Sequence, residues 1–175
     1  YDNDGDEDLY VVSGMLFKRG PTGQRNVLLR NRGDGTFADV SLASGADDPG
    51  VGRGGVYLDF NNDGCLDLFV SNLGQGAGLF QNMCVSGNNW LVIETVGTTS
   101  NRDGVGARIT VSTGGTTQIR EISGGRSSMG QNMLAAHIGL GDATVVDSVV
   151  IRWPSGVVQT LTDVPVNQRL TVTEP

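Results

Sequence analysis

The chain has 175 residues and a formal net charge of −7. This length suits one domain, or two small ones, with a genuine hydrophobic core. Because the chain is acidic and its 12 Lys and Arg residues form no basic patch in the sequence, we expect no nucleic-acid partner. No apolar run reaches the roughly 18 residues of a membrane-spanning helix, so we also expect no membrane span.

The composition predicts a turn-rich, folded chain. Gly accounts for 27 residues, and 15 of the 19 acidic residues are Asp. Asp and Gly favour turns, caps and metal-binding loops, whereas Glu favours helix faces. Eight of the acidic residues lie in two short segments, residues 2–8 and 59–67, so the acidity belongs to two loops and is not spread over the surface.

These two acidic segments are copies of one pattern. The first reads YDNDGDEDLYV from Tyr1, the second reads FNNDGCLDLFV from Phe60, and the offset between them is 59 residues. A second element repeats as VLLRN at 27–31 and GLFQN at 78–82. A repeat of this length, built from short strands and Gly-rich turns, indicates propeller blades or a similar array.

Strands are predicted where β-branched and aromatic residues lie between turn signals. A hairpin turn is expected at residues 32–35, where RGDG separates two apolar runs, and one helical turn is expected within 40–46. In chain order, the strands of the repeat region are predicted near 9–13, 26–31, 36–40, 55–59, 67–72 and 78–82.

After residue 82 the repeat stops and longer alternating segments follow. Seven strands at this spacing predict a β-sandwich or barrel of about 85 residues. They are predicted at 90–97, 106–113, 117–123, 133–140, 146–153, 157–162 and 169–174. We therefore expect an all-β protein with two domains, a repeat region over 1–87 and a sandwich over 88–175.

The second acidic loop offers oxygen ligands in alternate positions. Carboxylates and amides repeat every second residue, and Gly64 permits a sharp turn among them. A hard cation such as Ca²⁺ takes six to eight oxygens, and clustered carboxylates repel one another without a cation. The alternative is an Asx-rich turn that binds nothing. The predicted ligands are Asp59, Asn61, Asp63, the backbone carbonyl of Cys65, and Asp67.

The loop differs from an EF-hand because Val70 stands where that motif needs a bidentate Glu, and because a strand follows it. In the first copy the first ligand position would precede Tyr1, so we expect weaker binding or none there, and we expect the sequence to continue upstream. The first copy retains Asp2, Asp4, Asp6 through its carbonyl, and Asp8 as ligands.

These motifs resemble two known families. The pattern D-x-N/D-x-D-G-x-x-D-L, with L-x-x-N and NRGDGTFADV, resembles FG-GAP repeats of the VCBS type, which form calcium-loop blades of integrin-α-like β-propellers. NNWLVIETVGTTSNRDGVGARITV, HIGLG and VDSVVIRWPSGVVQTLTDVPVNQRLTVTE resemble the ASPIC/UnbV domain of the cartilage acidic protein-like family. The two resemblances cover almost the whole chain in the family's order.

The resemblance implies an extracellular or secreted protein, periplasmic or at the cell surface if bacterial, that binds Ca²⁺ and is not an enzyme. We expect it to act in protein or matrix binding and adhesion, with an extracellular protein or a polysaccharide as partner. A carbohydrate-binding or UnbV-like biosynthetic accessory protein is the alternative, and a sandwich that only caps the repeats is a third.

Cys65 and Cys84 could form a disulfide or be two separate buried thiols, and the sequence leaves this open. The Arg32-Gly33-Asp34 tripeptide spells an adhesion motif, but its place in a tight hairpin favours a turn role.

Three further candidates have structural explanations that we prefer. His137, imagined with Ser127 or Ser128 and Asp142 as a triad, lacks a nucleophile elbow and is expected to be a packed strand residue. The Gly-rich segment 100–108, with the polar groups Arg102, Asp103 and Arg108, suits a hairpin or bulge better than a phosphate loop. Core packing is likewise expected for the potential sugar platforms Trp90 and Trp153.

Overall fold

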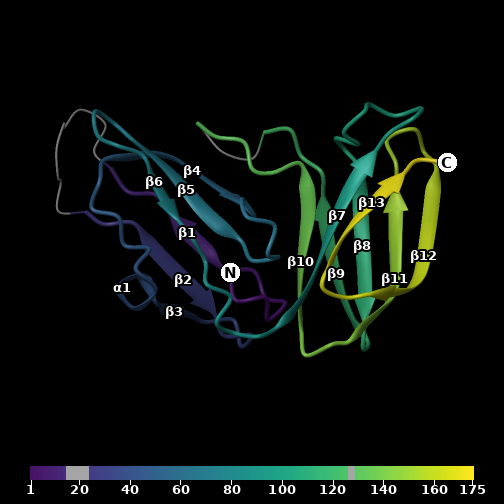
Figure 1. The fold of residues 1–175 in the computed structure, drawn as a ribbon, viewed down its shortest axis with the longest axis horizontal. Helices are drawn as coiled ribbons and strands as arrows, with labels where there is room; N and C mark the ends of the chain where they lie inside the picture. The colour runs from purple at the N-terminus through teal and green to yellow at the C-terminus, as the bar shows by residue number, and fades with distance from the viewer. Residues whose placement is uncertain (15–23, 126–128) are drawn as a thin grey trace. The chain divides into compact units, whose positions relative to one another are not determined.

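A computed structural model describes residues 1–14, 24–125 and 129–175, and shows a chain made of β-strands with one short helix (Figure 1). Packing divides it into two units. The repeat unit comprises Tyr1, Asp6–Met83 and Gly125–Met133, and the sandwich unit comprises Asp2–Gly5, Cys84–Gly124 and Leu134–Pro175. The expected all-β class is confirmed. The two units interleave short segments of the chain, so they do not correspond to a single boundary. The domain division predicted at residue 87 stays a prediction.

The repeat unit holds two three-stranded antiparallel sheets. The strands of the first follow one another along the chain, as do those of the second, so each sheet is a meander. The first sheet contains β1 (Leu9–Val11), β2 (Val27–Asn31) and β3 (Phe37–Asp39), and the second contains β4 (Gly52–Leu58), β5 (Asp67–Asn72) and β6 (Gly78–Phe80).

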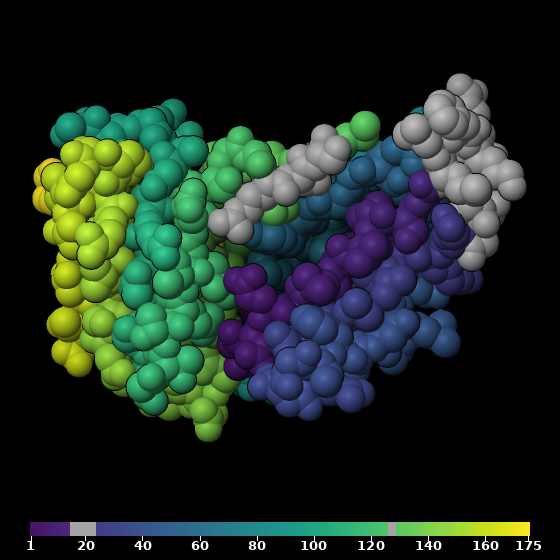
Figure 2. All heavy atoms as spheres, turned by 180° about the vertical axis from the view of Figure 1, so that it is seen from behind, coloured from purple at the N-terminus to yellow at the C-terminus, as the bar shows by residue number. Residues whose placement is uncertain are grey.

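The connections in this unit follow from local sequence. The β2–β3 hairpin turns at Gly33 and Gly35, whose φ angles of 72° and 83° lie in the left-handed region that glycine tolerates. The single helical turn expected near residue 40 is α1 (Ser41–Ser44), which ends at Gly45 with φ 75°. Figure 2 shows the early residues of the chain, in purple, beside the residues that follow in blue.

The sandwich unit stacks a three-stranded sheet and a four-stranded sheet. Their order is β10-β7-β13 and β12-β11-β8-β9, and β13 runs parallel to β7 while every other pairing is antiparallel. The strands are β7 (Asn89–Val96), β8 (Arg108–Thr113), β9 (Thr116–Glu121), β10 (Ala135–Gly141), β11 (Val145–Arg152), β12 (Val158–Pro165) and β13 (Gln168–Thr173).

Apolar side chains from both sheets form the core of the sandwich. Leu91, Ile93 and Ile138 come from one sheet, and Ile109 and Ile151 come from the other, all with no exposed surface. β-Branched residues dominate because they fit a pleated, buried surface. The sandwich predicted for this region is therefore present.

The end of β13 is held by a buried carboxylate. Glu174 is 2% exposed, and its side chain accepts hydrogen bonds from the backbone N–H groups of Thr98, Thr99 and Ser100 and from the hydroxyls of Ser100 and Ser155. Burial raises the pKa of Glu174, but the hydrogen bonds from Ser155, Ser100 and Thr98 outweigh it and lower the pKa to about 2. The carboxylate therefore joins two loops as an anion.

Candidate metal centre

The second acidic loop curls between β4 and β5. Asn62 and Gly64 adopt left-handed φ angles of 60° and 85°, which Asn and Gly tolerate better than other residues. The loop is fastened by its own side chains. The two carboxylate oxygens of Asp59 accept from the N–H groups of Asp63 at 3.1 Å and Gly64 at 3.2 Å, and Asp63 Oδ1 accepts from the N–H of Cys65 at 2.9 Å. These hydrogen bonds hold the predicted ligands Asp59 and Asp63 against the same turn.

Asp67 is the most deeply buried acid of this loop, with no exposed surface. Its carboxylate accepts from two neutral backbone N–H groups, that of Phe60 at 3.1 Å and that of Asn82 at 2.8 Å. Burial raises the pKa of Asp67; the hydrogen bonds from Asn82 and Phe60 lower it, and the neighbouring carboxylates of Asp63 and Asp59 raise it further, so the net shift is upward. The ionised form is therefore costly here unless a cation compensates for it.

The donor chemistry of the loop fits Ca²⁺. Three carboxylates and an amide oxygen lie within nine residues, and hard oxygen donors of this kind are what calcium selects. Asn61 Oδ1 faces inward far enough to accept from the N–H of Asp63 at 3.3 Å. Cys65 offers only its backbone carbonyl, because its sulfur is in a disulfide.

Cys65 and Cys84 are both disulfide-bonded. Since the chain has two cysteines, the bond joins them to one another, which resolves the alternative that the sequence left open. Disulfide sulfurs are not thiolate ligands, so soft metals such as zinc find no thiolate here.

The first loop repeats part of the bonding of the second, although the two hydrogen bonds to Asp59 have no counterpart in this sequence. Asn3 and Gly5 have φ angles of 60° and 101°, in register with Asn62 and Gly64. Each of the following contacts recurs at the offset of 59 residues. The N–H of Asp4 donates to Asp2 Oδ1 at 3.3 Å, as that of Asp63 donates to Asn61 Oδ1. The terminal ammonium group of Tyr1 pairs with Asp8 Oδ2 at the place where the backbone N–H of Phe60 donates to Asp67 Oδ2.

Packing divides the first loop between the two units. Asp2–Gly5 belongs to the sandwich unit, where the N–H of Gly141 donates to the carbonyl of Asn3 at 2.8 Å, while Asp6 and Asp8 belong to the repeat unit. The ligand set predicted there, Asp2, Asp4, Asp6 and Asp8, stays a prediction.

Two asparagines that sequence analysis did not single out hold the acidic loops through hydrogen bonds. Asn31 is the last residue of β2 and Asn82 lies two residues after β6. Their N–H groups each donate to the last acid of a loop at 2.8 Å, Asp8 and Asp67 respectively. Their side-chain amides also donate to the carbonyl just before that acid, Asn31 to Glu7 at 3.2 Å and Asn82 to Leu66 at 3.3 Å. The recurring Asn of VLLRN and GLFQN was the only sequence signal for this role.

Two of the remaining candidate residues, His137 and Trp153, are buried. His137 is 8% exposed on β10, Trp153 is 3% exposed, and the indole N–H of Trp153 donates to Gln159 at 3.0 Å. Ser127 and Ser128 lie outside the described residues. The side chain of Asn101 bonds both the N–H and the carbonyl of Val105, which closes the Gly-rich loop on itself.

Asp34 of the RGD tripeptide stabilises the hairpin turn in which it lies. Its Oδ1 accepts from the N–H of Thr36 at 2.9 Å and from the Thr36 hydroxyl at 2.6 Å, and these hydrogen bonds, the hydroxyl's first, hold the pKa of Asp34 below its usual value.

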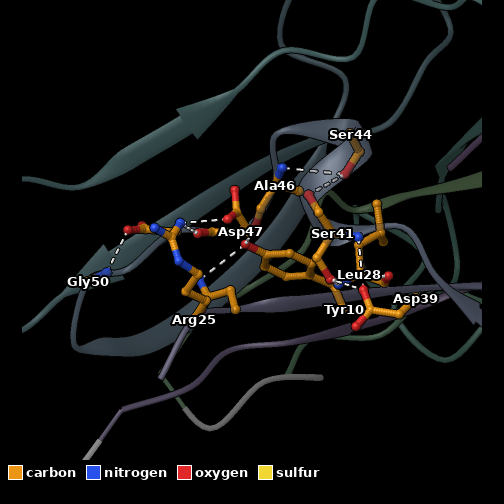
Figure 3. A network of polar contacts seen from close by, with 11 residues as sticks. Tyr10, Arg25, Leu28, Asp39, Ser41, Ser44, Ala46, Asp47 and Gly50 are labelled. Carbon is orange, nitrogen blue, oxygen red and sulfur yellow. Dashed lines mark hydrogen bonds and ion pairs between the residues drawn. The ribbon is translucent and has the colours of Figure 1, made fainter. Parts of the chain in front are cut away.

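A cavity of about 330 Å³ in the repeat unit lies between the segment after α1 and the β5–β6 turn. Its charged groups have partners within the repeat unit. Arg25 pairs with Asp47, as Figure 3 shows, and Asp48 accepts from the N–H of Gly50 at 2.7 Å and from the amide of Asn72 at 2.9 Å. The same figure shows the Tyr10 hydroxyl, which donates to the carbonyl of Ala46 at 2.8 Å. These polar groups hold the wall of the cavity together.

Two family comparisons agree with the architecture. Residues 1–70 match the FG-GAP-like repeat, and residues 97–175 match the family described as ASPIC and UnbV. The chain is therefore an FG-GAP-like repeat region followed by an ASPIC/UnbV domain, as its motifs indicated.

Cartilage acidic protein 1 of three vertebrates is among the proteins similar to this chain. That of Mus musculus is 30% identical over 161 residues, covering 89% of this chain and 25% of the relative, and that of Homo sapiens is 29% identical over the same length, covering 89% and 24%. The chain thus spans about a quarter of the length of the curated relatives it matches. Within the described residues, no helix has the length and apolarity needed to cross a membrane.

Proposed function

We propose that this chain is a calcium-binding, non-catalytic extracellular module that binds proteins or matrix, and that calcium has a structural role in it. The burial of Asp67 beside two further carboxylates carries the proposal. A group of this kind is costly as an isolated anion and favourable beside a divalent cation.

Asp59, Asn61, Asp63, Asp67 and the carbonyl of Cys65 would hold the ion. Bound calcium supplies positive charge to the clustered carboxylates. The chain's own residues position the ligands. Asp59 and Asp63 accept hydrogen bonds that fix the turn, and Asn82 holds Asp67 in place at the start of β5. The loop would then fix the connection between β4 and β5.

The extracellular assignment is supported by the disulfide and by the relatives. Disulfides persist in oxidising compartments and are rare in the cytosol. Similarity to cartilage acidic protein 1 supports a matrix-related setting. The partner would be an extracellular protein or a polysaccharide.

Calcium titration by isothermal calorimetry tests the proposal. We expect a dissociation constant of about 10⁻⁴–10⁻³ M, the range of extracellular modules. Asp63→Asn should weaken binding at least tenfold. Asp34→Asn is the matched control, because Asp34 is also an exposed turn aspartate but lies in a hairpin outside the loop. Equal affinity in all three proteins, or no heat of binding in the unmutated protein, contradicts the calcium assignment.

A further inference from the structure

The four-stranded sheet of the sandwich unit has one face in the core and one face outward. Ile109 and Val111 of β8 and Val149 and Ile151 of β11 are buried in the core, so the residues that alternate with them point outward. The strand order and the pairing registers place these outward residues in three cross-strand rows (Figure 1). We call them the outer face. Read from β9 to β12, the rows are Glu121, Arg108, Arg152 and Val158; Ile119, Thr110, Val150 and Thr160; and Thr117, Ser112, Ser148 and Thr162.

Two arginines stand directly opposite one another in the first row. Arg108 and Arg152 are cross-strand partners, and both are exposed. Neither guanidinium group has an ion-pair or hydrogen-bond partner among the described residues. Side chains in this position start from Cβ atoms about 5 Å apart, and like charges there repel one another. An anion that contacts both groups removes this repulsion.

The charge of the outer face is opposite in sign to that of the whole chain. Its two guanidinium groups are accompanied by one carboxylate, that of Glu121, whereas the chain has a net charge of −7. The acidic segment Asp2–Gly5 belongs to the same unit but bonds to the other sheet, where the N–H of Gly141 donates to the carbonyl of Asn3. The arginine pair is thus a local positive site on an acidic protein.

The rest of the outer face is rich in hydroxyl groups. Ser112 and Thr117 place their hydroxyl oxygens 3.3 Å apart, and such groups can both donate and accept hydrogen bonds. The apolar members do not gather into a patch, because each has a polar residue directly across the strand. These members are Ile119 and Val150, which both neighbour Thr110, and Val158, which neighbours Arg152.

We propose that the outer face binds a sulfated polysaccharide, with Arg108 and Arg152 on its sulfate groups and the Ser and Thr rows against its hydroxyls. The inference rests on the proposed function, since it names the partner of the matrix-binding module. An arginine fork binds an oxyanion through two parallel hydrogen bonds and keeps its charge at physiological pH. A polysaccharide carries anionic groups and hydroxyls along one extended chain, so it complements both parts of this face. A lipid surface would instead require gathered apolar side chains.

Calorimetric titration of the full chain with a heparin hexasaccharide in EDTA tests the proposal. The unmutated protein should bind, and its affinity should fall as NaCl rises from about 50 mM to about 300 mM. Arg108→Gln and Arg152→Gln should each weaken binding about three- to tenfold, and the double variant should show no heat of binding. The double variant should melt at the same or a higher temperature, because the cross-strand repulsion is gone. A lower melting temperature would show that the arginines are structural and would overturn the proposal.

Arg30→Gln is the matched control. Arg30 is also an exposed strand arginine, but it lies on β2 of the repeat unit opposite Ala38, so this variant should bind heparin like the unmutated protein. An equal loss in Arg30→Gln, or no heparin binding by the unmutated protein, overturns the proposal. Equal affinity for an uncharged dextran oligosaccharide also overturns it.

Two further measurements separate this face from other modes of binding. Phosphatidylserine vesicles that bind as tightly as heparin, with the same dependence on Arg108 and Arg152, would assign the face to a membrane and overturn the proposal. Heparin binding that needs Ca²⁺ would place the polysaccharide at an acidic loop and overturn it as well. Calcium titration of the same samples tests the proposed function separately. A protein that binds Ca²⁺ but no heparin loses only this inference.

Discussion

The backbone N–H of Asn82 donates to the buried carboxylate of Asp67 at 2.8 Å, while the side-chain amide of Asn82 donates to the carbonyl of Leu66 at 3.3 Å. Asn82 therefore hydrogen-bonds both to the last acid of the loop and to the carbonyl of the residue before it. Asn31 and Asp8 repeat the arrangement in the first copy. The conformation of each loop thus depends on a strand or segment that comes later in the chain.

Asn82→Ala should lower the free energy of unfolding by about 1–2 kcal/mol. The substitution keeps the backbone bond to Asp67 but removes the amide bonds to Leu66 and to the carbonyl of Tyr1, which is 2.7 Å away. Urea denaturation measures the loss. Asn82→Asp should be worse than alanine, because it turns an acceptor towards two carbonyls. Equal stability of Asn82→Asp and the unmutated protein would argue against this clasp.

Asp67→Asn should change its effect with the calcium concentration. In EDTA the substitution removes a buried anion whose pKa is raised by burial, but it also turns an amide NH2 towards one of the two backbone N–H groups that the carboxylate accepts from, so these two effects on the melting temperature oppose one another. In 10 mM Ca²⁺ the unmutated protein should gain about 1–3 kcal/mol from binding, and the variant should gain little. Differential scanning calorimetry in both buffers measures the effect of the substitution without calcium and the stabilisation that calcium adds.

The same calorimetric comparison on Asp34→Asn provides the control, since Asp34 lies outside the loop. The difference in melting temperature between EDTA and 10 mM Ca²⁺ should be as large for Asp34→Asn as for the unmutated protein. An Asp67→Asn protein that still gains the full calcium shift would show that Asp67 is not a ligand.

Glu174→Gln should reduce stability at neutral pH and change its acid dependence. The folded state lowers the pKa of Glu174 to about 2, so the contribution of the carboxylate is fully present above its unfolded pKa, near 4.5. That contribution is lost as the pH falls from about 4.5 towards 2. Melting temperatures measured between pH 2 and 7 should therefore separate the two proteins above pH 4.5 and converge below it. A constant separation down to pH 2 would contradict the role assigned to the ionised carboxylate.

Gly139→Ala should destabilise the protein by about 1–3 kcal/mol. A Cβ at this position in β10 would lie 2.7 Å from Asn3 Cα and 2.8 Å from its carbonyl carbon, and backbone atoms cannot easily move away. Chemical denaturation measures the loss. Gly76→Ala is the control, because nothing lies within 4 Å of its Cβ position, and its effect should stay within about 0.5 kcal/mol.

Much of the local structure could be predicted because it depends on neighbouring residues. Alternating apolar residues located the strands, and the Gly33–Gly35 turn was legible because left-handed φ angles favour glycine. The β4 strand begins at Gly52, three residues before the predicted start at residue 55, since its glycines carry no apolar signal and instead permit close packing against Val12.

The sequence by itself determined the all-β class, the order of repeat and sandwich, and the candidate ligands from Asp59 to Asp67, because these follow from short-range spacing and turn chemistry. Only the tertiary structure decided the pairing of Cys65 with Cys84, the parallel alignment of β13 with β7, and the grip of Asn82 on Asp67. It also decided which apolar faces are buried and which are exposed. Those features join residues far apart in the chain, and their free energy depends on how the strands pack, which no local pattern of residues encodes.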